Sequence, residues 1–366
     1  MAFTTIDDPS AYFHVQLYTG NDGTDRLITN DANAGDFRPD FLWLKNRDAT
    51  GRPVVFDSSR LASGEATMRL STDLADVHED KVDRFGGFET DGFTVDGSDD
   101  DTNENADKYV AWQWKANGGS ISATFSEVGT NPAGNRQVNT TAGFSLMTWT
   151  GTGVIDSGTS GTIAHGLGAV PHFWMIKCLS NAHDWAVYHH KNTAAPETDF
   201  LVLNETNATA DNDNKWNDTA PTSTNITLKD GGGVNRNDET HVGYVWTEIQ
   251  GYSKFGSYTG NGVANGPFVY TGFSPAFIII KKTSGSGQWL MFDNKRNENN
   301  PTTSWLAAEV NTAETADSNK DIDMLSNGFK ARDTGGDMND NGGTYVYAAF
   351  AEQPFVTSTG TPCTAR

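Results

Sequence analysis

Three copies of one pattern divide this chain, and an internal repeat constrains a fold more than any single motif does. Each copy contains a proline, an apolar run and a lysine six residues after that proline: Pro39–Lys45, Pro171–Lys177 and Pro275–Lys281. Because proline lacks a backbone donor, it is tolerated at the start of a strand. Each segment is therefore predicted to be a buried strand that begins at its proline.

Counting from these lysines locates the rest of the repeat. Asp57, His189 and Asp293 stand 12 residues on, each after an aromatic residue, which predicts the end of a second strand. An asparagine recurs 60 residues after each lysine, and an aromatic-rich strand begins four residues later. Two sets of positions are thus expected to superpose in the modules, namely Lys45, Lys177 and Lys281, and Asn105, Asn237 and Asn341.

The recurring lysines are expected at strand edges, with their stems on apolar surface and their ammonium groups in water. Asp57 and Asp293 are their candidate partners, and His189 is a weaker one in the middle copy.

The repeat divides the chain into modules of about 100 residues. Each holds about six to eight short strands between Gly, Asn and Asp clusters, as in sandwiches. The predicted fold class is all-β, three tandem β-sandwich-like modules with little helix, a short one being allowed only within Ser58–Leu74. The predicted units are module 1 at 1–116, a Gly- and Ser-rich linker at 117–141, module 2 at 142–250, module 3 at 251–355 and a flexible polar tail at 356–366.

Charge excludes several classes of partner. The net charge of −21, from 47 acidic and 26 basic side chains, repels phosphate backbones and anionic lipid surfaces, so no nucleic acid is expected as a partner. The N-terminal residues show no signal peptide, and the longest apolar run, Phe277–Ile280, is too short for membrane insertion. Two cysteines, Cys178 and Cys363, do not make a disulfide framework.

Signatures of catalysis and metal binding are missing. The only histidine cluster, His183, His189 and His190, comes without H-E-x-x-H or C-x-x-C spacing, and G-x-S-x-G does not occur. Asp337–Gly342 matches the first half of an EF-hand loop, but Ala348 stands where the closing glutamate belongs. An Asx turn is favoured there, with calcium as the alternative. No catalytic residue, metal or cofactor is predicted.

Longer strings carry a family resemblance. Gly251–Gly262, His165–Gly168, Trp216–Ser223 and Gly342–Phe355 resemble tail-fibre-like structural proteins of marine bacteriophages, over nearly the whole chain. The resemblance implies a non-enzymatic virion protein, a tail fibre or surface fibre adhesin that serves assembly and host-surface recognition. Its implied location is the virion, and its implied partners are other virion proteins, further copies of itself, with a trimer favoured, and a host surface glycan. The alternatives are a glycan-cleaving depolymerase, a capsid-surface decoration protein and a stand-alone lectin-like module.

A glycan site would use residues that the fold does not repeat. Trp216 has no aromatic counterpart in the other copies, and its polar neighbours include Asn214, Asn217 and Asp218. Sugars stack C–H groups on an aromatic face and give their hydroxyls to amides and carboxylates. These four residues form the predicted ligand site, unless Trp216 is a buried staple that pins its loop to module 2.

Overall fold

The computed structural model describes residues 4–31, 37–61, 68–80, 84–155, 157–316 and 319–363. Strands make up almost all of their regular structure, which confirms the all-β fold class. The described helices are one α-helical turn, α1 (Ser58–Leu61), and two 3-10 turns, η1 (Pro9–Ala11) and η2 (Pro196–Thr198). Within these ranges no helix has the length and apolar character needed to span a membrane.

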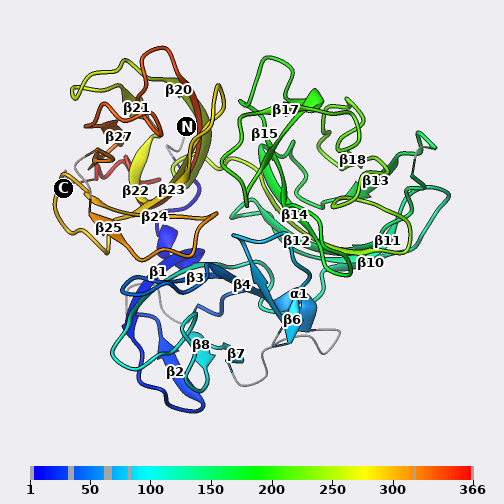
Figure 1. The fold of residues 1–366 in the computed structure, drawn as a ribbon, viewed down its shortest axis with the longest axis horizontal. Coiled ribbons are helices and arrows are strands. Elements are labelled where there is room, and N and C mark those ends of the chain that lie inside the picture. Colours follow the sequence, from blue (N-terminus) through cyan, green and yellow to red (C-terminus); the bar gives the residue numbers. More distant parts are fainter. Residues whose placement is uncertain are drawn as a thin grey trace.

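Three lobes surround a common centre (Figure 1), and each lobe is one β-sandwich-like module with a large and a small antiparallel sheet. In module 1 the large sheet runs β1 (Phe13–Thr19), β9 (Lys108–Trp114), β3 (Phe41–Asn46), β4 (Val54–Asp57), β5 (Met68–Ser71) and β6 (Glu79–Asp80). The small sheet runs β2 (Arg26–Thr29), β8 (Gly92–Val95) and β7 (Phe85–Glu89).

Module 3 repeats this strand order. Its large sheet runs β20 (Ser253–Thr259), β28 (Thr344–Pro354), β22 (Phe273–Lys282), β23 (Trp289–Asp293), β24 (Ser304–Ala307) and β25 (Thr315–Ala316). Its small sheet runs β21 (Phe268–Tyr270), β27 (Gly328–Ala331) and β26 (Ile322–Leu325).

Module 2 has the same order with two strands added at one edge. Its large sheet runs β10 (Ala123–Phe125), β11 (Ala133–Asn139), β12 (Phe144–Thr150), β19 (Thr240–Trp246), β14 (Phe173–Cys178), β15 (Ala186–His189), β16 (Asp199–Val202) and β17 (Ala210–Asp211). Its small sheet pairs β13 (Gly161–Ala164) with β18 (Asn225–Leu228).

Two segments differ from the sequence-based expectation. The predicted linker, 117–141, contains β10 and β11, which extend the large sheet of module 2 because β11 pairs with β12 along its whole length. The tail expected to be flexible folds back on itself, with a bridge between Val356 and Pro362. Of the stretch in which a helix was allowed, residues 62–67 lie outside the described residues, and Met68–Ser71 is a strand.

The three recurring lysines occupy one position of the sandwich. Each pairs across the large sheet with a valine, Lys45 with Val110, Lys177 with Val242 and Lys281 with Val346. The recurring asparagines also share one position, because the residue after each of them donates its N–H to the carbonyl of the glycine that directly follows β1, β12 or β20. Those three donors, Ala106, Asp238 and Gly342, all have positive φ.

The three recurring lysines are buried. The expectation that they lie at strand edges with their ammonium groups in water is therefore wrong. Their exposed fractions are 1% or less, and each ammonium donates to the carbonyl six residues ahead, that of Gly51, His183 or Gly287. Burial lowers the pKa of all three to about 8. Backbone carbonyls accept the hydrogen bonds of each buried ammonium group. The lysines therefore do not need the predicted pairing with Asp57, His189 or Asp293.

The innermost strands are apolar on both faces because both faces are buried. In β3, Leu42 and Leu44 face the core between the two sheets of module 1. Phe41 and Trp43 face a second cluster, which contains side chains from all three modules and which we call the central aromatic core. A strand buried on both sides appears in sequence as a continuous apolar run, as the three proline-started segments do.

Three equivalent aromatic residues meet in the central aromatic core. Trp114, Trp246 and Phe350 stand 69 residues after their lysines. Their ring centroids are 6.1 Å apart for Trp114 and Trp246, 5.3 Å for Trp114 and Phe350, and 6.3 Å for Trp246 and Phe350. The modules are therefore related by a pseudo-threefold axis through this triangle.

The residues 12 after each lysine form the junctions around that axis. Asp57 of module 1 accepts a hydrogen bond from Tyr244 Oη of module 2 at 2.8 Å, and Asp293 of module 3 accepts one from Trp112 Nε1 of module 1 at 3.2 Å. His189 Nε2 of module 2 lies 3.0 Å from the carbonyl of Tyr347 in module 3. Each module thus contacts the next in the same head-to-tail way, and the ring closes after three.

Candidate functional site

Trp216 does not offer the predicted sugar platform. Its ring is 1% exposed, packs edge-on against Trp174 with centroids 5.1 Å apart, and donates Nε1–H to the carbonyl of Asp199 at 3.0 Å. Burying a large aromatic ring with its N–H satisfied is more favourable than exposing it. The polar neighbours Asn214, Asn217 and Asp218 belong to the loop that this ring staples to module 2, so the predicted site is not formed.

An exposed aromatic pair lies instead on module 3. Phe268 and Tyr270 in β21 are 48% and 57% exposed, whereas Val269 between them points inward. Tyr270 borders a groove of about 350 Å³ between the end of module 2 and module 3, which we call the β21 groove. Glu248 and Lys254 line the same groove and pair with each other at 2.5 Å. Stackable rings beside charged groups are suited to sugar recognition.

The criterion of non-recurrence could have found this pair in the sequence. Strand register places Phe268 and Tyr270 opposite Lys330 and Gly328, as Leu27 and Thr29 of module 1 lie opposite Thr94 and Gly92. The aromatic rings are thus peculiar to module 3. Trp216 attracted the prediction because its polar neighbours are adjacent in sequence, whereas those of Tyr270 come from the end of module 2, with Glu248, and from β20, with Lys254.

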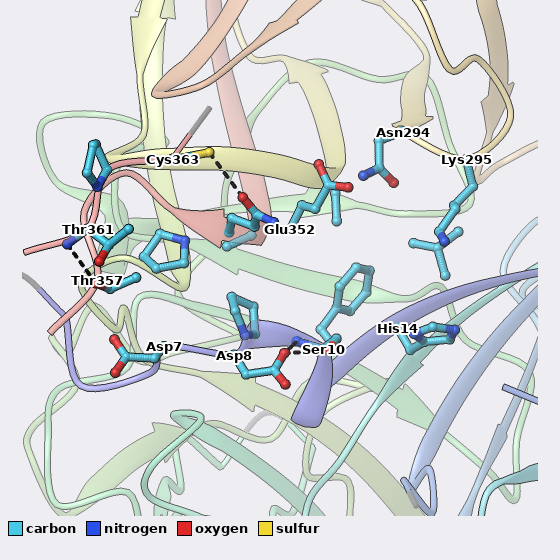
Figure 2. A pocket seen from close by; sticks show the side chains of 18 residues that line it. Asp7, Asp8, Ser10, His14, Asn294, Lys295, Glu352, Thr357, Thr361 and Cys363 are labelled. Atoms are coloured by element: carbon cyan, nitrogen blue, oxygen red, sulfur yellow. Dashed lines mark hydrogen bonds between the residues drawn. The ribbon is translucent and has the colours of Figure 1, made fainter. Parts of the chain in front are cut away.

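A pocket of about 490 Å³ lies where the N-terminal segment meets the end of module 3 (Figure 2). Asp7, Asp8 and Glu352 bring carboxylates to it, and Lys295 brings an ammonium group. Lys295 Nζ also lies 3.1 Å from Asp31, which pairs with His14 of this pocket at 2.8 Å. Charged groups of both signs thus line this pocket beside apolar side chains such as Phe13 and Val15.

Of the three clustered histidines of the sequence, His189 and His190 stay close, with ring centroids 5.6 Å apart, whereas His183 joins a different group of side chains. His189 is buried at the junction with module 3, and burial lowers its pKa to about 3. His190 lies beside His172 and Glu248, and burial lowers its pKa to about 4. His183 joins Cys178 and Glu239 at one end of module 2. The last two groups are the described sets whose side chains could hold a metal ion, and the sequence shows no metal-binding motif because the members of each set come from separate segments of the chain.

The segment expected to be an Asx turn has a structural role in every module. Asn339 is buried, and its Oδ1 accepts from the N–H of Asn261 at 2.8 Å. Asn103 and Asn235 accept in the same way from Asn21 and Thr152, 3.2 Å away in each case. These buried asparagines, 58 residues after the lysines, are a repeat feature that the sequence comparison missed.

Comparison with known proteins gives a family but no function. A family model described as a domain of unknown function (DUF7483) matches residues 8–354. No curated protein and no solved structure matches the chain. The matched range covers every strand of the three modules, from β1 to β28. The chain belongs to the DUF7483 family.

Proposed function

We propose that this protein is a structural component of a bacteriophage virion, a tail fibre or surface fibre adhesin that contributes to assembly and host-surface recognition. The phage origin rests on the resemblance of its repeated strings to tail-fibre-like proteins. The observation that carries the structural role is the closed ring of three sandwiches around the central aromatic core. A ring that buries its module faces against one another is a rigid block, as a particle component requires.

Assembly would use the outer surfaces of the ring. The faces that a trimer of separate modules would bury are already covered within one chain, because Trp114, Trp246 and Phe350 contact one another. Further copies of the protein or other virion proteins would therefore attach through the small sheets and loops. The net charge of −21 favours solubility of the free chain before assembly.

Recognition of a host surface glycan would use Phe268, Tyr270 and the β21 groove. The two rings lie on one face of β21 because side chains alternate along a strand. Glu248 and Lys254 line the groove beside Tyr270. The carboxylate of Glu248 can accept hydrogen bonds from sugar hydroxyls, and the ammonium group of Lys254 can donate to them. The exposed rings offer apolar area that the fold itself leaves uncovered.

The virion role is tested on purified phage particles. Quantitative mass spectrometry and immunogold labelling should find the chain in fixed copy number and at one location on the particle. Intact, infectious particles that lack it would contradict the proposal.

Recognition is tested separately, through adsorption to host cells. Tyr270→Ala and Phe268→Ala should lower adsorption of the protein about tenfold, since one stacked aromatic is worth roughly 1–1.5 kcal/mol. Leu27→Ala, at the position of Phe268 in module 1, is the matched control and should leave adsorption unchanged. Equal adsorption of all three variants and the wild type would overturn the recognition part alone.

A further inference from the structure

Cys178, His183 and Glu239 form a compact group in module 2, here the Cys–His–Glu cluster. Cys178 ends β14, Glu239 directly precedes β19, and His183 lies in the loop after β14. Glu239 Oε2 is 3.4 Å from Cys178 Sγ and 3.2 Å from His183 Nε2. The thiol and the carboxylate are buried, and the imidazole side chain is 23% exposed, so one side of the cluster borders solvent.

The fold does not need these side chains. At the positions of Cys178 and Glu239, module 1 has Asn46 and Asp107, joined by a hydrogen bond of 2.9 Å between Nδ2 and Oδ2. Module 3 has Lys282 and Gly343 there, and Gly51 and Gly287 stand at the position of His183. Because the same sandwich forms with all three combinations, the Cys–His–Glu combination is specific to module 2 and has no structural requirement behind it.

The spacing of the ligand atoms suits a tetrahedral ion. Bond lengths of about 2.0–2.3 Å to oxygen, nitrogen and sulfur place the ligands of tetrahedral zinc roughly 3.3–3.7 Å apart. The separations of Glu239 Oε2 from His183 Nε2 and from Cys178 Sγ, 3.2 and 3.4 Å, need to change by only a few tenths of an ångström. All three ligand atoms lie within 4.8 Å of one another.

We propose that the Cys–His–Glu cluster is a binding site for one zinc-class divalent cation. A thiolate excludes Mg²⁺ and Ca²⁺, and imidazole and carboxylate together favour Zn²⁺ or Co²⁺ over Cu⁺. On binding, Cys178 releases its thiol proton to solvent, and the S–H to Glu239 contact is replaced by two bonds to the metal. Three protein ligands leave the fourth tetrahedral position for a water molecule.

Neighbouring groups position the ligands. Asn181 Nδ2 donates to Glu239 Oε1 at 2.8 Å, which leaves Oε2 facing the other two ligand atoms. Lys177 Nζ donates to the backbone carbonyls of Cys178 and His183, at 3.1 and 2.8 Å, so the recurring lysine ties both ligand-bearing segments together. Partners behind the ligands commonly tune metal affinity in this way.

The second set, His172, His190 and Glu248, serves as an internal control. His172 Nδ1 accepts from the N–H of Glu248 at 3.0 Å, and His190 Nε2 bonds the carbonyl of Phe255 at 2.7 Å. Glu248 pairs with Lys254 at 2.5 Å. Both imidazoles of this set thus hydrogen-bond to backbone groups, and the set contains no thiol.

The test is titration of the full chain, purified with chelator, with Co²⁺ and Zn²⁺. The wild type and His190→Ala should each bind one ion, and Co²⁺ should give a thiolate-to-cobalt charge-transfer band. His183→Ala should weaken binding at least about tenfold, and Cys178→Ser should abolish the band. The proposal is overturned if the wild-type protein gives no such band. It is also overturned if His183→Ala and Cys178→Ser keep the affinity and the band of the wild type.

A second measurement does not depend on changing the buried cysteine. In a Cys363→Ser background, Cys178 is the only thiol. Zn²⁺ should slow its alkylation at least about tenfold, and His183→Ala, which alters a partly exposed side chain, should remove most of that protection. Alkylation at the same rate with and without Zn²⁺ contradicts the site.

Discussion

Modules 1 and 3 build their junctions with ion pairs, whereas module 2 builds the equivalent junction without charge. Asp57 pairs with Arg60 at 2.6 Å and Asp293 with Arg296 at 2.5 Å, all four side chains being buried. Module 2 has His189 and Asn192 at these positions. The neutral imidazole of His189 and the carboxylates of Asp57 and Asp293 thus make equivalent contacts to a neighbouring module. We expect these junctions to respond differently to mutation and to pH.

The largest contrast is expected from removing the residue at this position. Asp57→Ala leaves the buried guanidinium of Arg60 without its carboxylate, and breaking a buried pair costs about 3–5 kcal/mol. His189→Ala removes neutral hydrogen bonds and should cost about 1–3 kcal/mol. The measurement is the free energy of unfolding in urea. Equal losses in the two variants would mean that the charge of the junction has no energetic consequence.

Acid should act on module 2 before module 3. His189 Nε2–H donates to the carbonyl of Tyr347 while Nδ1 accepts from the N–H of Lys191 at 3.1 Å, which fixes the neutral form. Burial lowers the pKa of His189 and His241 to about 3. Below about pH 6.5 the unfolded chain therefore binds protons that the folded chain does not, and stability falls as pH falls towards 3.

His190, whose pKa burial lowers to about 4, adds a third histidine of this kind to the acid effect. Between pH 7.5 and 5.5 His189 and His241 should each cost about 1.4 kcal/mol of the free energy of unfolding. His189→Asn should flatten the pH dependence by at most about a third, since His190 and His241 remain. Module 3 contains no histidine, so hydrogen exchange in its strands should change least at pH 5.5. Exchange that rises equally in the outer strands of modules 2 and 3 would show that other groups dominate.

The smallest contrast concerns one backbone position. Ala106 of module 1 has φ of 70°, and its equivalent in module 3 is Gly342 with φ of 77°. Left-handed backbone is strained for alanine, so Ala106→Gly should stabilise the chain by about 0.5–1 kcal/mol and Gly342→Ala should destabilise it by about 1 kcal/mol. Thermal melting of both variants checks the signs. A shift of the same sign in both would refute the equivalence of these residues.

The sequence predicted the positions that recur in every module. It did not predict the contacts between side chains of different modules. Equal spacings were enough to place Lys45, Lys177 and Lys281 at one position, because every copy of the sandwich satisfies the same backbone. The burial of these lysines was not predictable, since their acceptors are carbonyls that no side-chain pattern shows. The predicted exposure of Trp216 was wrong for a related reason. Polar residues next to a tryptophan in the sequence do not determine whether its ring faces solvent or the core.

The candidate sites could not be predicted from the sequence either, because each joins residues from distant parts of the chain. Cys178 and Glu239 are far apart in the chain and meet only because β14 and β19 pair. The β21 groove joins Glu248 of module 2 to Tyr270 of module 3. Contacts of this kind need the three-dimensional arrangement, whereas the absence of H-E-x-x-H or C-x-x-C spacing excludes only sites formed by a local motif.

The closed ring is tested most directly by hydrogen exchange on two tryptophan variants. Trp246 lies in the central aromatic core, and Trp216 lies in the core of module 2 alone. Both substitutions by alanine should cost about 3–5 kcal/mol. The account predicts that Trp246→Ala lowers protection in β9 and β28 as well as in β19, while Trp216→Ala lowers it only in module 2. Loss of protection confined to module 2 in both variants would contradict a core shared by the three modules.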